Sequence, residues 1–137
     1  MAIKTILVSQ PKPEGVKSPY FDLAEKYKLK IDFRPFIFVE GIQAQEFRTQ
    51  RVNLNEHTAV ILTSKAAIDN FFRIADETRF TVPDTMKYFC ISEAVAYYLQ
   101  KYVSYRKRKI FFGKQTIDDL IDTIKKHKKE KFLLPCT

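Results

Sequence analysis

Hydroxyl side chains recur in this sequence where an apolar, strand-like run gives way to helical spacing. They are Thr63 and Ser64 after the run 58–62, Ser92 after the run 88–91, and Thr116 after the run 109–112. Ser and Thr are preferred at the start of helices because the side-chain oxygen accepts a hydrogen bond from a free N–H of the first turn. A helix N-terminus also favours carboxylates and phosphates, because it carries free N–H groups and the positive end of the helix dipole. The turns therefore predict an anion-binding edge, although capping alone would also explain each hydroxyl.

A basic charge balance supports the same chemistry. The chain has 24 Lys and Arg against 16 Asp and Glu, which gives a formal charge of +8 at pH 7. Such an excess favours acidic partners such as nucleic acid, anionic lipid or a polycarboxylate ligand. Lys12, Lys65 and Lys114 lie in the predicted turns and add positive charge there, though each one alone is more simply explained as a surface lysine.

The spacing of apolar residues predicts repeated strand–helix units. Strands are expected at 58–62, 88–91, 109–112 and 132–135, and helices at 64–77, 92–102 and 116–126. Strands that alternate with helices predict an α/β domain in which helices flank a parallel sheet and the crossovers are right-handed. The carboxyl ends of parallel strands share one edge of the sheet, so we expect the hydroxyl turns to lie along that edge.

The first part of the chain predicts a smaller strand–helix unit. Residues 4–9 are expected to form a strand, and Ser18 followed by Pro19 is typical of a helix start. The run 29–39 alternates apolar and polar residues like a long strand. Pro35 interrupts this run, which favours an edge strand or a strand that crosses between two bodies.

We therefore predict three segments. Residues 1–33 are expected to form the strand–helix part of an incomplete first α/β domain, and residues 34–40 a linker or ladder strand. Residues 41–137 are expected to form a second α/β domain, which begins with a polar helix over 42–54. This domain ends on a strand with no helix after it, so we expect it to be truncated at its C-terminal side.

Composition argues against several kinds of site. With three Gly and neither GxGxxG nor GxxxxGK[ST], the chain has no Gly-rich phosphate loop. Cys90 and Cys136 form no CxxC pair, and His57 and His127 lie far apart, so no metal site is expected. Isolated cysteines fit a reduced intracellular protein. No run could span a membrane or serve as a signal peptide, so we predict a cytoplasmic location.

No catalytic residues can be assigned from the residues alone. There is no Ser–His–Asp order of suggestive spacing and no pair of carboxylates in an apolar frame. The segment 102–112 interleaves basic and aromatic residues, which can suit single-stranded nucleic acid. We interpret 110–112 as a core strand instead, and expect no nucleic-acid partner.

Five segments, taken in order, resemble the uroporphyrinogen-III synthase family. ILVSQPKP at 6–13 resembles the VLVTRP start of that family, and LTSKAAIDNF at 62–71 resembles its FTSxxAV turn and helix. CISEAVAYYL at 90–99 resembles AVGxxTAxAL. GKQTIDDLIDTI at 113–124 resembles a segment with Thr or Ser before a leucine-rich helix, and FLLPCT at 132–137 resembles LFPRG. The resemblance is closest to Bacteroidetes-type members and covers the N-terminal half of such an enzyme.

The resemblance implies a fold and a reaction. The implied fold has two flavodoxin-like (HemD-like) α/β domains joined by a two-stranded β-ladder. The implied reaction is that of a lyase without a cofactor in tetrapyrrole and heme biosynthesis. Linear hydroxymethylbilane loses water, ring D inverts and the macrocycle closes. This substrate is a polycarboxylate, which suits the basic balance. The full-length protein is expected to be a monomer with no membrane or nucleic-acid partner.

Carried over position by position, the resemblance also implies substrate-binding residues. They are Ser9, Thr63, Ser64, Ser92 and Thr116. The sequence departs from the family pattern at Gln10, Ser92 and Val95, which replace Arg, Gly and Thr. No catalytic residue is assigned, because the tyrosine often proposed as proton donor in the family lies beyond residue 137. We therefore expect this chain alone to be inactive or very weak, and an exposed ladder strand to allow it to self-associate. The alternative is a flavodoxin-like anion-binding or regulatory module without chemistry.

Overall fold

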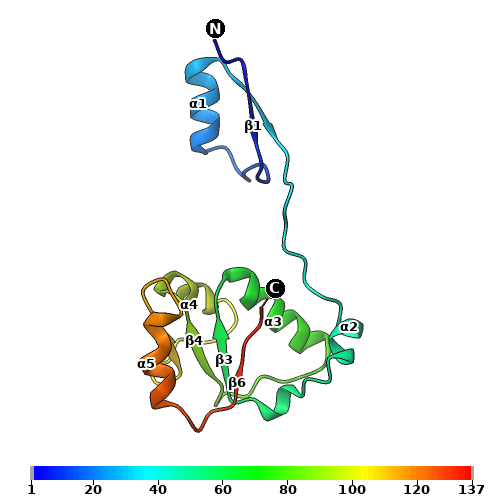
Figure 1. Cartoon of the computed structure of the whole chain (residues 1–137), viewed down its shortest axis with the longest axis vertical. Coiled ribbons are helices and arrows are strands. Elements are labelled where there is room, and N and C mark those ends of the chain that lie inside the picture. The colour runs from blue at the N-terminus through cyan, green and yellow to red at the C-terminus, as the bar shows by residue number, and fades with distance from the viewer. Residues whose placement is uncertain (1, 137) are drawn as a thin grey trace. The chain divides into compact units, whose positions relative to one another are not determined.

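The computed structural model describes residues 2–136, which form two compact units, residues 2–40 and residues 41–136. Each unit contains a parallel sheet flanked by helix (Figure 1). The predicted fold class, α/β with a parallel sheet and flanking helices, is therefore confirmed. None of the described helices combines the length and the apolar character needed to cross a membrane.

The first unit is a single strand–helix–strand repeat. It consists of β1 (Thr5–Val8), α1 (Pro19–Tyr27) and β2 (Lys30–Phe33), and the two strands pair in parallel. The helix begins where the sequence predicts: Ser18 Oγ accepts a hydrogen bond from Tyr20 N at 3.3 Å, and Pro19 is the first helical residue. The apolar side chains described between residues 2 and 40 are all half-buried or exposed. This unit therefore has no fully buried apolar core of its own.

The strand predicted over 29–39 was too long. β2 is only four residues long, and the last ladder bond after it runs from Arg34 N to Val8 O at 2.8 Å. Beyond that point β1 has ended, and Pro35 has no N–H with which to continue a ladder. Residues 36–39 are apolar and between 60% and 86% exposed. A ladder strand at 34–40 remains a prediction, because no described strand pairs with it.

The second unit contains a larger sheet. Its helices are α2 (Ala44–Thr49), η1 (Leu54–Glu56, a 3-10 helix), α3 (Lys65–Glu77), α4 (Glu93–Leu99) and α5 (Asp118–Lys126), and its strands are β3 (Ala59–Leu62), β4 (Lys87–Cys90), β5 (Ile110–Phe112) and β6 (Phe132–Leu133). All the strands pair in parallel, in the order β5-β4-β3-β6. Each strand and helix predicted between residues 58 and 135 is present, with differences only at the ends.

The polar helix predicted over 42–54 was also too long. α2 covers only its middle, because Arg51 takes a φ of 54°, outside the right-handed helical region. Asn53 then starts the separate helix η1, where its side chain accepts a hydrogen bond from Asn55 N at 3.1 Å.

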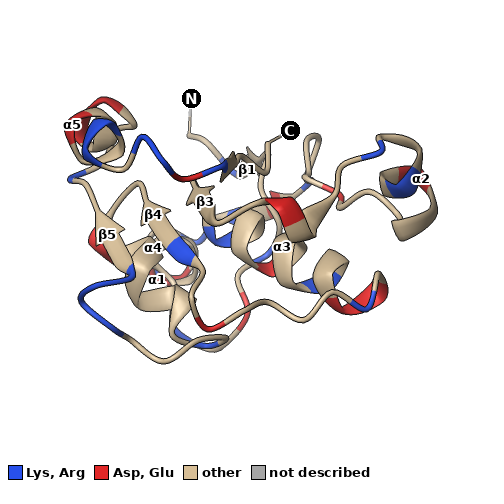
Figure 2. Cartoon of the chain, turned by 90° about the horizontal axis from the view of Figure 1, so that it is seen from below, with Lys and Arg blue, Asp and Glu red and all other residues tan. Residues whose placement is uncertain are grey.

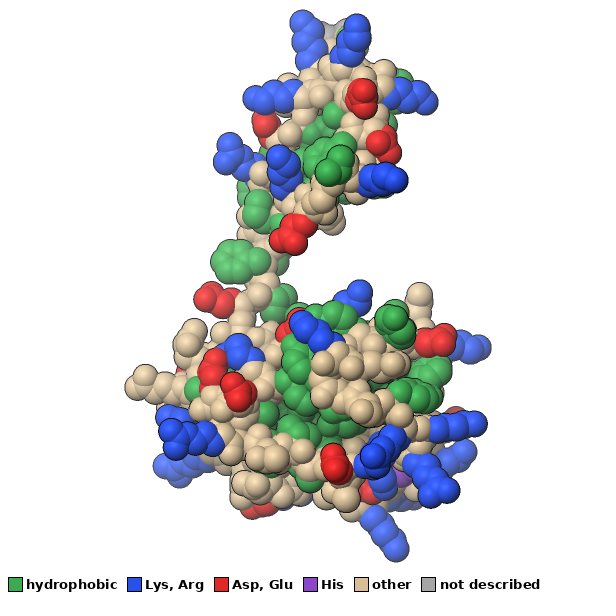
Figure 3. Space-filling view, turned by 180° about the vertical axis from the view of Figure 1, so that it is seen from behind, with side chains coloured by type: hydrophobic (Ala, Val, Ile, Leu, Met, Phe, Trp, Pro, Cys, Tyr) green, Lys and Arg blue, Asp and Glu red, His purple; other side chains and the backbone are tan. Residues whose placement is uncertain are grey.

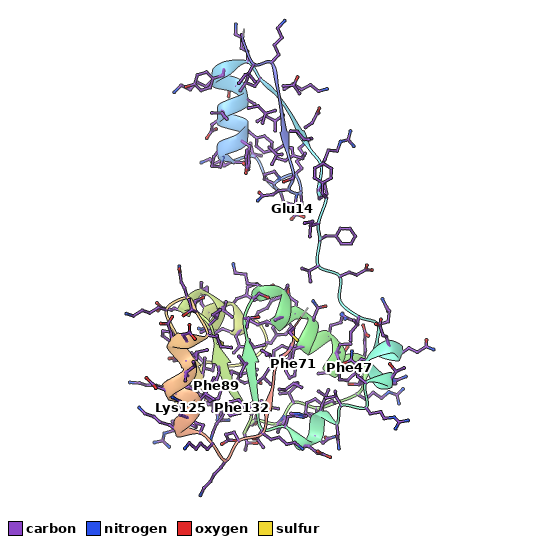
Figure 4. The ribbon with its side chains drawn as sticks, in the orientation of Figure 1. Glu14, Phe47, Phe71, Phe89, Lys125 and Phe132 are labelled. Atoms are coloured by element: carbon purple, nitrogen blue, oxygen red, sulfur yellow. The ribbon has the colours of Figure 1, made fainter. Side chains whose placement is uncertain are left out.

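The sheet is covered by α3 and α4 on one face and by α5 on the other. Alternate residues of a strand point to opposite faces. Val60 and Leu62 accordingly belong to the apolar cluster that includes α3 and α4, whereas Phe89 packs with Leu120 of α5. Phe89 and Phe132, labelled in Figure 4, lie with their ring centroids 5.1 Å apart in this second cluster.

The order of the strands reverses once. The chain steps outward from β3 to β4 to β5 and then returns, through α5, to place β6 on the other side of β3. In open parallel sheets, ligands bind outside the carboxyl ends of the strands where the order reverses. Here that point lies between the carboxyl ends of β3 and β6.

Candidate functional site

The carboxyl ends of β3, β4 and β5 lie side by side. Leu62 pairs with Cys90, and Cys90 pairs with Phe112, so the three strands end at the same level. Adjacent strands are about 4.8 Å apart. The turns that follow these strands, residues 63–66, 91–94 and 113–117, therefore lie along one edge of the sheet. We call these residues the rim.

Two hydroxyls of the rim cap helices. Ser64 Oγ accepts a hydrogen bond from Ala67 N at 3.0 Å, and Ser92 Oγ accepts one from Val95 N at 3.3 Å. A hydroxyl has two acceptor positions and one donor hydrogen, and capping uses only an acceptor position. Both serines can therefore cap a helix and still donate a hydrogen bond to an anion.

The first turn of α3 adds further donors beside Ser64. The N–H groups of Lys65 and Ala66 have no hydrogen-bond acceptor among the described residues, as is usual at the start of a helix. Ser64 is exposed and Thr63, which directly follows β3, is half-buried. An anion at this turn would meet the Ser64 hydroxyl, these N–H groups and the positive end of the α3 dipole.

Thr116 does not cap α5, although its place at the start of the predicted helix favoured that role. Asp119 Oδ2 instead accepts hydrogen bonds from Gln115 N at 3.0 Å, Thr116 N at 3.0 Å and Thr116 Oγ1 at 3.1 Å. These bonds, that from Gln115 N first, lower the pKa of Asp119 to about 2, so its carboxylate is ionised at neutral pH. Thr116 donates its only hydroxyl hydrogen to Asp119, so it has no hydrogen left to donate to a ligand.

The charge of the rim is mixed. Lys65 and Lys114 are balanced by Glu93 of the rim and by Asp119 of the adjoining helix α5, and Figure 2 shows acidic and basic residues on α5 alike. Lys65 Nζ lies 5.5 Å from the centre of the Tyr98 ring, in a cation–π contact with α4. Lys and Arg side chains project from both units on the face that Figure 3 shows.

Ser9 and Lys12 belong to the first unit. Ser9 follows β1 and is exposed, and its hydroxyl has no hydrogen-bond partner within residues 2–136. The other four sequence-predicted binding residues belong to the second unit, where the structure brings them to the rim.

Sequence reasoning missed the role of Gly113 in the third turn. A Cβ on Gly113 would lie 2.8 Å from Asp119 Cβ and 3.3 Å from the carbonyl oxygen of Ile91. Only glycine therefore lets this loop approach α5 so closely. The sequence did carry a signal for this contact, because Gly113 directly follows a predicted strand and Asp119 comes six residues later.

A second polar cluster joins α3 to α4 and was also missed. Asp69 accepts hydrogen bonds from Tyr102 OH at 2.5 Å and from Tyr98 OH at 2.8 Å, and Lys101 Nζ lies 3.8 Å from the same carboxylate. The bond from Tyr102 contributes most to lowering the pKa of Asp69. Tyr98 lies in α4 and Tyr102 three residues after its end, and both hydroxyls reach the same carboxylate.

No group of three or more His, Cys, Asp or Glu side chains within the described chain could hold a metal ion. Both cysteines are free, with Cys90 buried and Cys136 exposed.

Comparison with known proteins gives one finding. A family model described as uroporphyrinogen-III synthase HemD matches residues 19–137. This range contains the whole rim but not Ser9. No match was found among curated proteins.

Proposed function

The chain belongs to the uroporphyrinogen-III synthase family, a family of lyases in porphyrin and heme biosynthesis, and on this premise we propose that its protein converts hydroxymethylbilane to uroporphyrinogen III. The linear tetrapyrrole loses its hydroxyl group as water, ring D inverts and the macrocycle closes. The observation that carries the proposal is the family match, which spans the rim. The free donors at the start of α3 support it, because the substrate is a polycarboxylate.

The rim would act by holding carboxylates. Ser64 donates its hydroxyl hydrogen to one carboxylate, together with the N–H groups of Lys65 and Ala66, and Ser92 contributes a second hydroxyl one strand away. The leaving hydroxyl departs readily once the tail of the bilane is fixed. Catalysis therefore rests on positioning and on stabilisation of charge rather than on one essential side chain.

The remaining binding residues are part of the same proposal, with different requirements. Thr63 borders Ser64 and is half-buried, and Ser9 is exposed, so both hydroxyls are available to substrate. Thr116 can donate to a carboxylate only after it gives up its bond to Asp119. We expect Thr116 to contribute less than the two serines.

Residues 1–137 alone are proposed to be inactive or very weak. The carboxyl group of Asp119 contacts the rim from α5, and its pKa of about 2 keeps it from donating a proton at neutral pH. The rim hydroxyls of Ser64 and Thr116 are also open to water, which weakens every electrostatic contact made there. The proposal extends to a two-domain protein with residues 34–40 as a ladder strand, monomeric and cytoplasmic.

The test is an assay of the intact protein with hydroxymethylbilane, in which the type III and type I isomers are separated. We expect the type III isomer, and a rate lowered about 10-fold or more in Ser64→Ala, because a hydrogen bond to a charged group is worth about 1.5–3 kcal/mol. Ser104→Ala is the control, since this exposed serine makes no hydrogen bond with the described residues.

Two results would count against the proposal at different levels. Exclusive formation of the type I isomer would reject the synthase function and favour a non-catalytic anion-binding module. Type III product at an unchanged rate in Ser64→Ala and Ser92→Ala would keep the function and reject the rim as the binding site.

A further inference from the structure

A cavity of about 460 Å³ lies at the opposite edge of the second unit from the rim. Its lining includes Tyr88 and Ile110, which lie at or near the start of their strands. The loops that lead into β4 and β5 complete this side of the lining. Its volume falls within the range of small-molecule sites. Because it is bordered by the amino ends of the strands, it is separate from the proposed substrate site and does not depend on it.

Tyr88 is a largely buried residue whose hydroxyl is available to this cavity. Tyr88 is only 4% exposed, and its hydroxyl has no hydrogen-bond partner among the described residues. Every fully buried side-chain oxygen or nitrogen in the described chain has a hydrogen-bond partner. The Tyr88 hydroxyl therefore keeps some contact with solvent, through the cavity that Tyr88 lines. Burial, with the nearby Asp84 carboxylate, raises the pKa of Tyr88 to about 12. The phenol is therefore a donor at neutral pH.

One wall of the cavity is aromatic and held in place. The rings of Phe72 and Tyr102 stack with centroids 4.4 Å apart and planes 3° apart, and Phe72 also lies 6.4 Å from the Tyr88 ring. Tyr102 OH donates to Asp69 at 2.5 Å, which fixes its ring. A wall ordered before binding favours a flat aromatic ligand, because little conformational entropy is lost on association.

The charged groups at the mouth distinguish between ligands of opposite sign. Asp76, Asp84 and Arg106 are exposed, whereas Lys109 is half-buried beside Ile110. Lys109 is thus the least exposed of these four charged residues, and a less exposed charge is less screened by water. An anionic group on the ligand is favoured over a cationic one.

We propose that this cavity binds a small aromatic carboxylate, with its ring against Phe72 and Tyr102 and its carboxylate near Lys109 and the Tyr88 hydroxyl. The ring packs against the aromatic residues of the cavity, and the carboxylate accepts a hydrogen bond from the Tyr88 hydroxyl, which has no partner among the described residues. The site is a second ligand site of this protein, on the far side of the sheet from the rim.

The experiment is a titration of the ¹⁵N-labelled full chain with benzoate, followed by NMR. We expect saturable shift changes at the amides of Val82, Val103 and Lys109, with a dissociation constant of about 1 mM for so small a ligand. Tyr88→Phe keeps the ring and the fold but removes the donor, so it should raise the dissociation constant about 3- to 10-fold. Lys109→Gln should do the same, and Arg108→Gln, in the same loop but outside the cavity lining, should change nothing.

Other outcomes would overturn the proposal. Shift changes at the rim instead of the cavity would place benzoate at the wrong site. Equal affinity for benzylamine would show that the charge assignment is wrong. Unchanged affinity in both Tyr88→Phe and Lys109→Gln, with thermal unfolding intact, would show that neither group holds the ligand, and the absence of saturable changes at cavity amides would reject the site.

Discussion

Replacement of Ser64 by Ala tests whether this residue both caps α3 and binds substrate. The variant removes the oxygen that accepts from Ala67 N at 3.0 Å and leaves that N–H to water, because Ser64 is exposed. Loss of an N-cap costs about 1 kcal/mol, within a range of about 0.5–2. For a domain of this size, that free energy corresponds to a fall in melting temperature of about 4–8 °C.

The assay is thermal unfolding followed by circular dichroism, with urea unfolding as a check on the free energy. Ser92→Ala removes a longer cap bond, of 3.3 Å, so its melting temperature should fall by the same amount or less. Ser104→Ala should stay within about 0.5 kcal/mol of the parent, as expected for a surface change away from any cap. If Ser64→Ala unfolded at the temperature of Ser104→Ala, the assignment of Ser64 as a cap would be refuted.

Two further substitutions at the same residue separate capping from binding. Asn and Asp cap helices about as well as Ser, so Ser64→Asn and Ser64→Asp should both keep the stability of the parent. Asp also places a negative charge where a carboxylate is proposed to bind. Synthase activity of the intact protein should therefore fall much further in Ser64→Asp than in Ser64→Asn. Equal activity of the two variants would show that no anion binds beside Ser64.

Three other predictions concern the third turn and the thiols. Gly113→Ala should destabilise the second unit by about 1–3 kcal/mol in urea unfolding, because the new methyl group would lie 2.8 Å from Asp119 Cβ; an unchanged midpoint would mean that the loop relaxes freely. Asp119→Asn should melt below the parent at pH 6. The difference in melting temperature should disappear as the pH falls from about 4 towards 2. The pKa of Asp119 is lowered from 3.8 to about 2 in the fold, so the stability that the ionised carboxylate adds is lost when it is protonated. A difference in melting temperature that did not depend on pH would contradict this assignment. A thiol reagent should modify Cys136 quickly and Cys90 only after unfolding, because burial raises the pKa of Cys90 to about 12; rapid reaction of both thiols in the folded chain would show that Cys90 is accessible.

The repeated strand–helix pattern of the second unit could be predicted because local signals agreed with the fold there. Ser64 and Ser92 precede apolar spacing of period 3.6, and both cap helices in the structure. The parallel sheet follows from the alternation itself, and with it the shared edge that gathers the turns. The family resemblance, which rested on several short motifs in order, agrees with the family match.

The errors arise where a tertiary partner or one backbone angle decides the structure. The strand expected over 29–39 ends at Phe33, because a strand needs a neighbour and the sequence pattern does not show how far that neighbour extends. The helix over 42–54 ended early because of the φ angle of Arg51, for which its residue type gives no warning. At Thr116 a hydroxyl expected to cap the next helix donates to Asp119 instead, because a carboxylate is a stronger hydrogen-bond acceptor than a hydroxyl.

The absence of fully buried apolar side chains between residues 2 and 40 has a thermodynamic consequence. Heat capacity of unfolding scales with the apolar surface that becomes exposed, and this segment has little left to expose. A calorimeter would therefore register the melting of the second unit almost alone. Amide protons of β1 and β2 should exchange with solvent at nearly the rate of an unfolded peptide, while those of β3 exchange only when the whole unit opens.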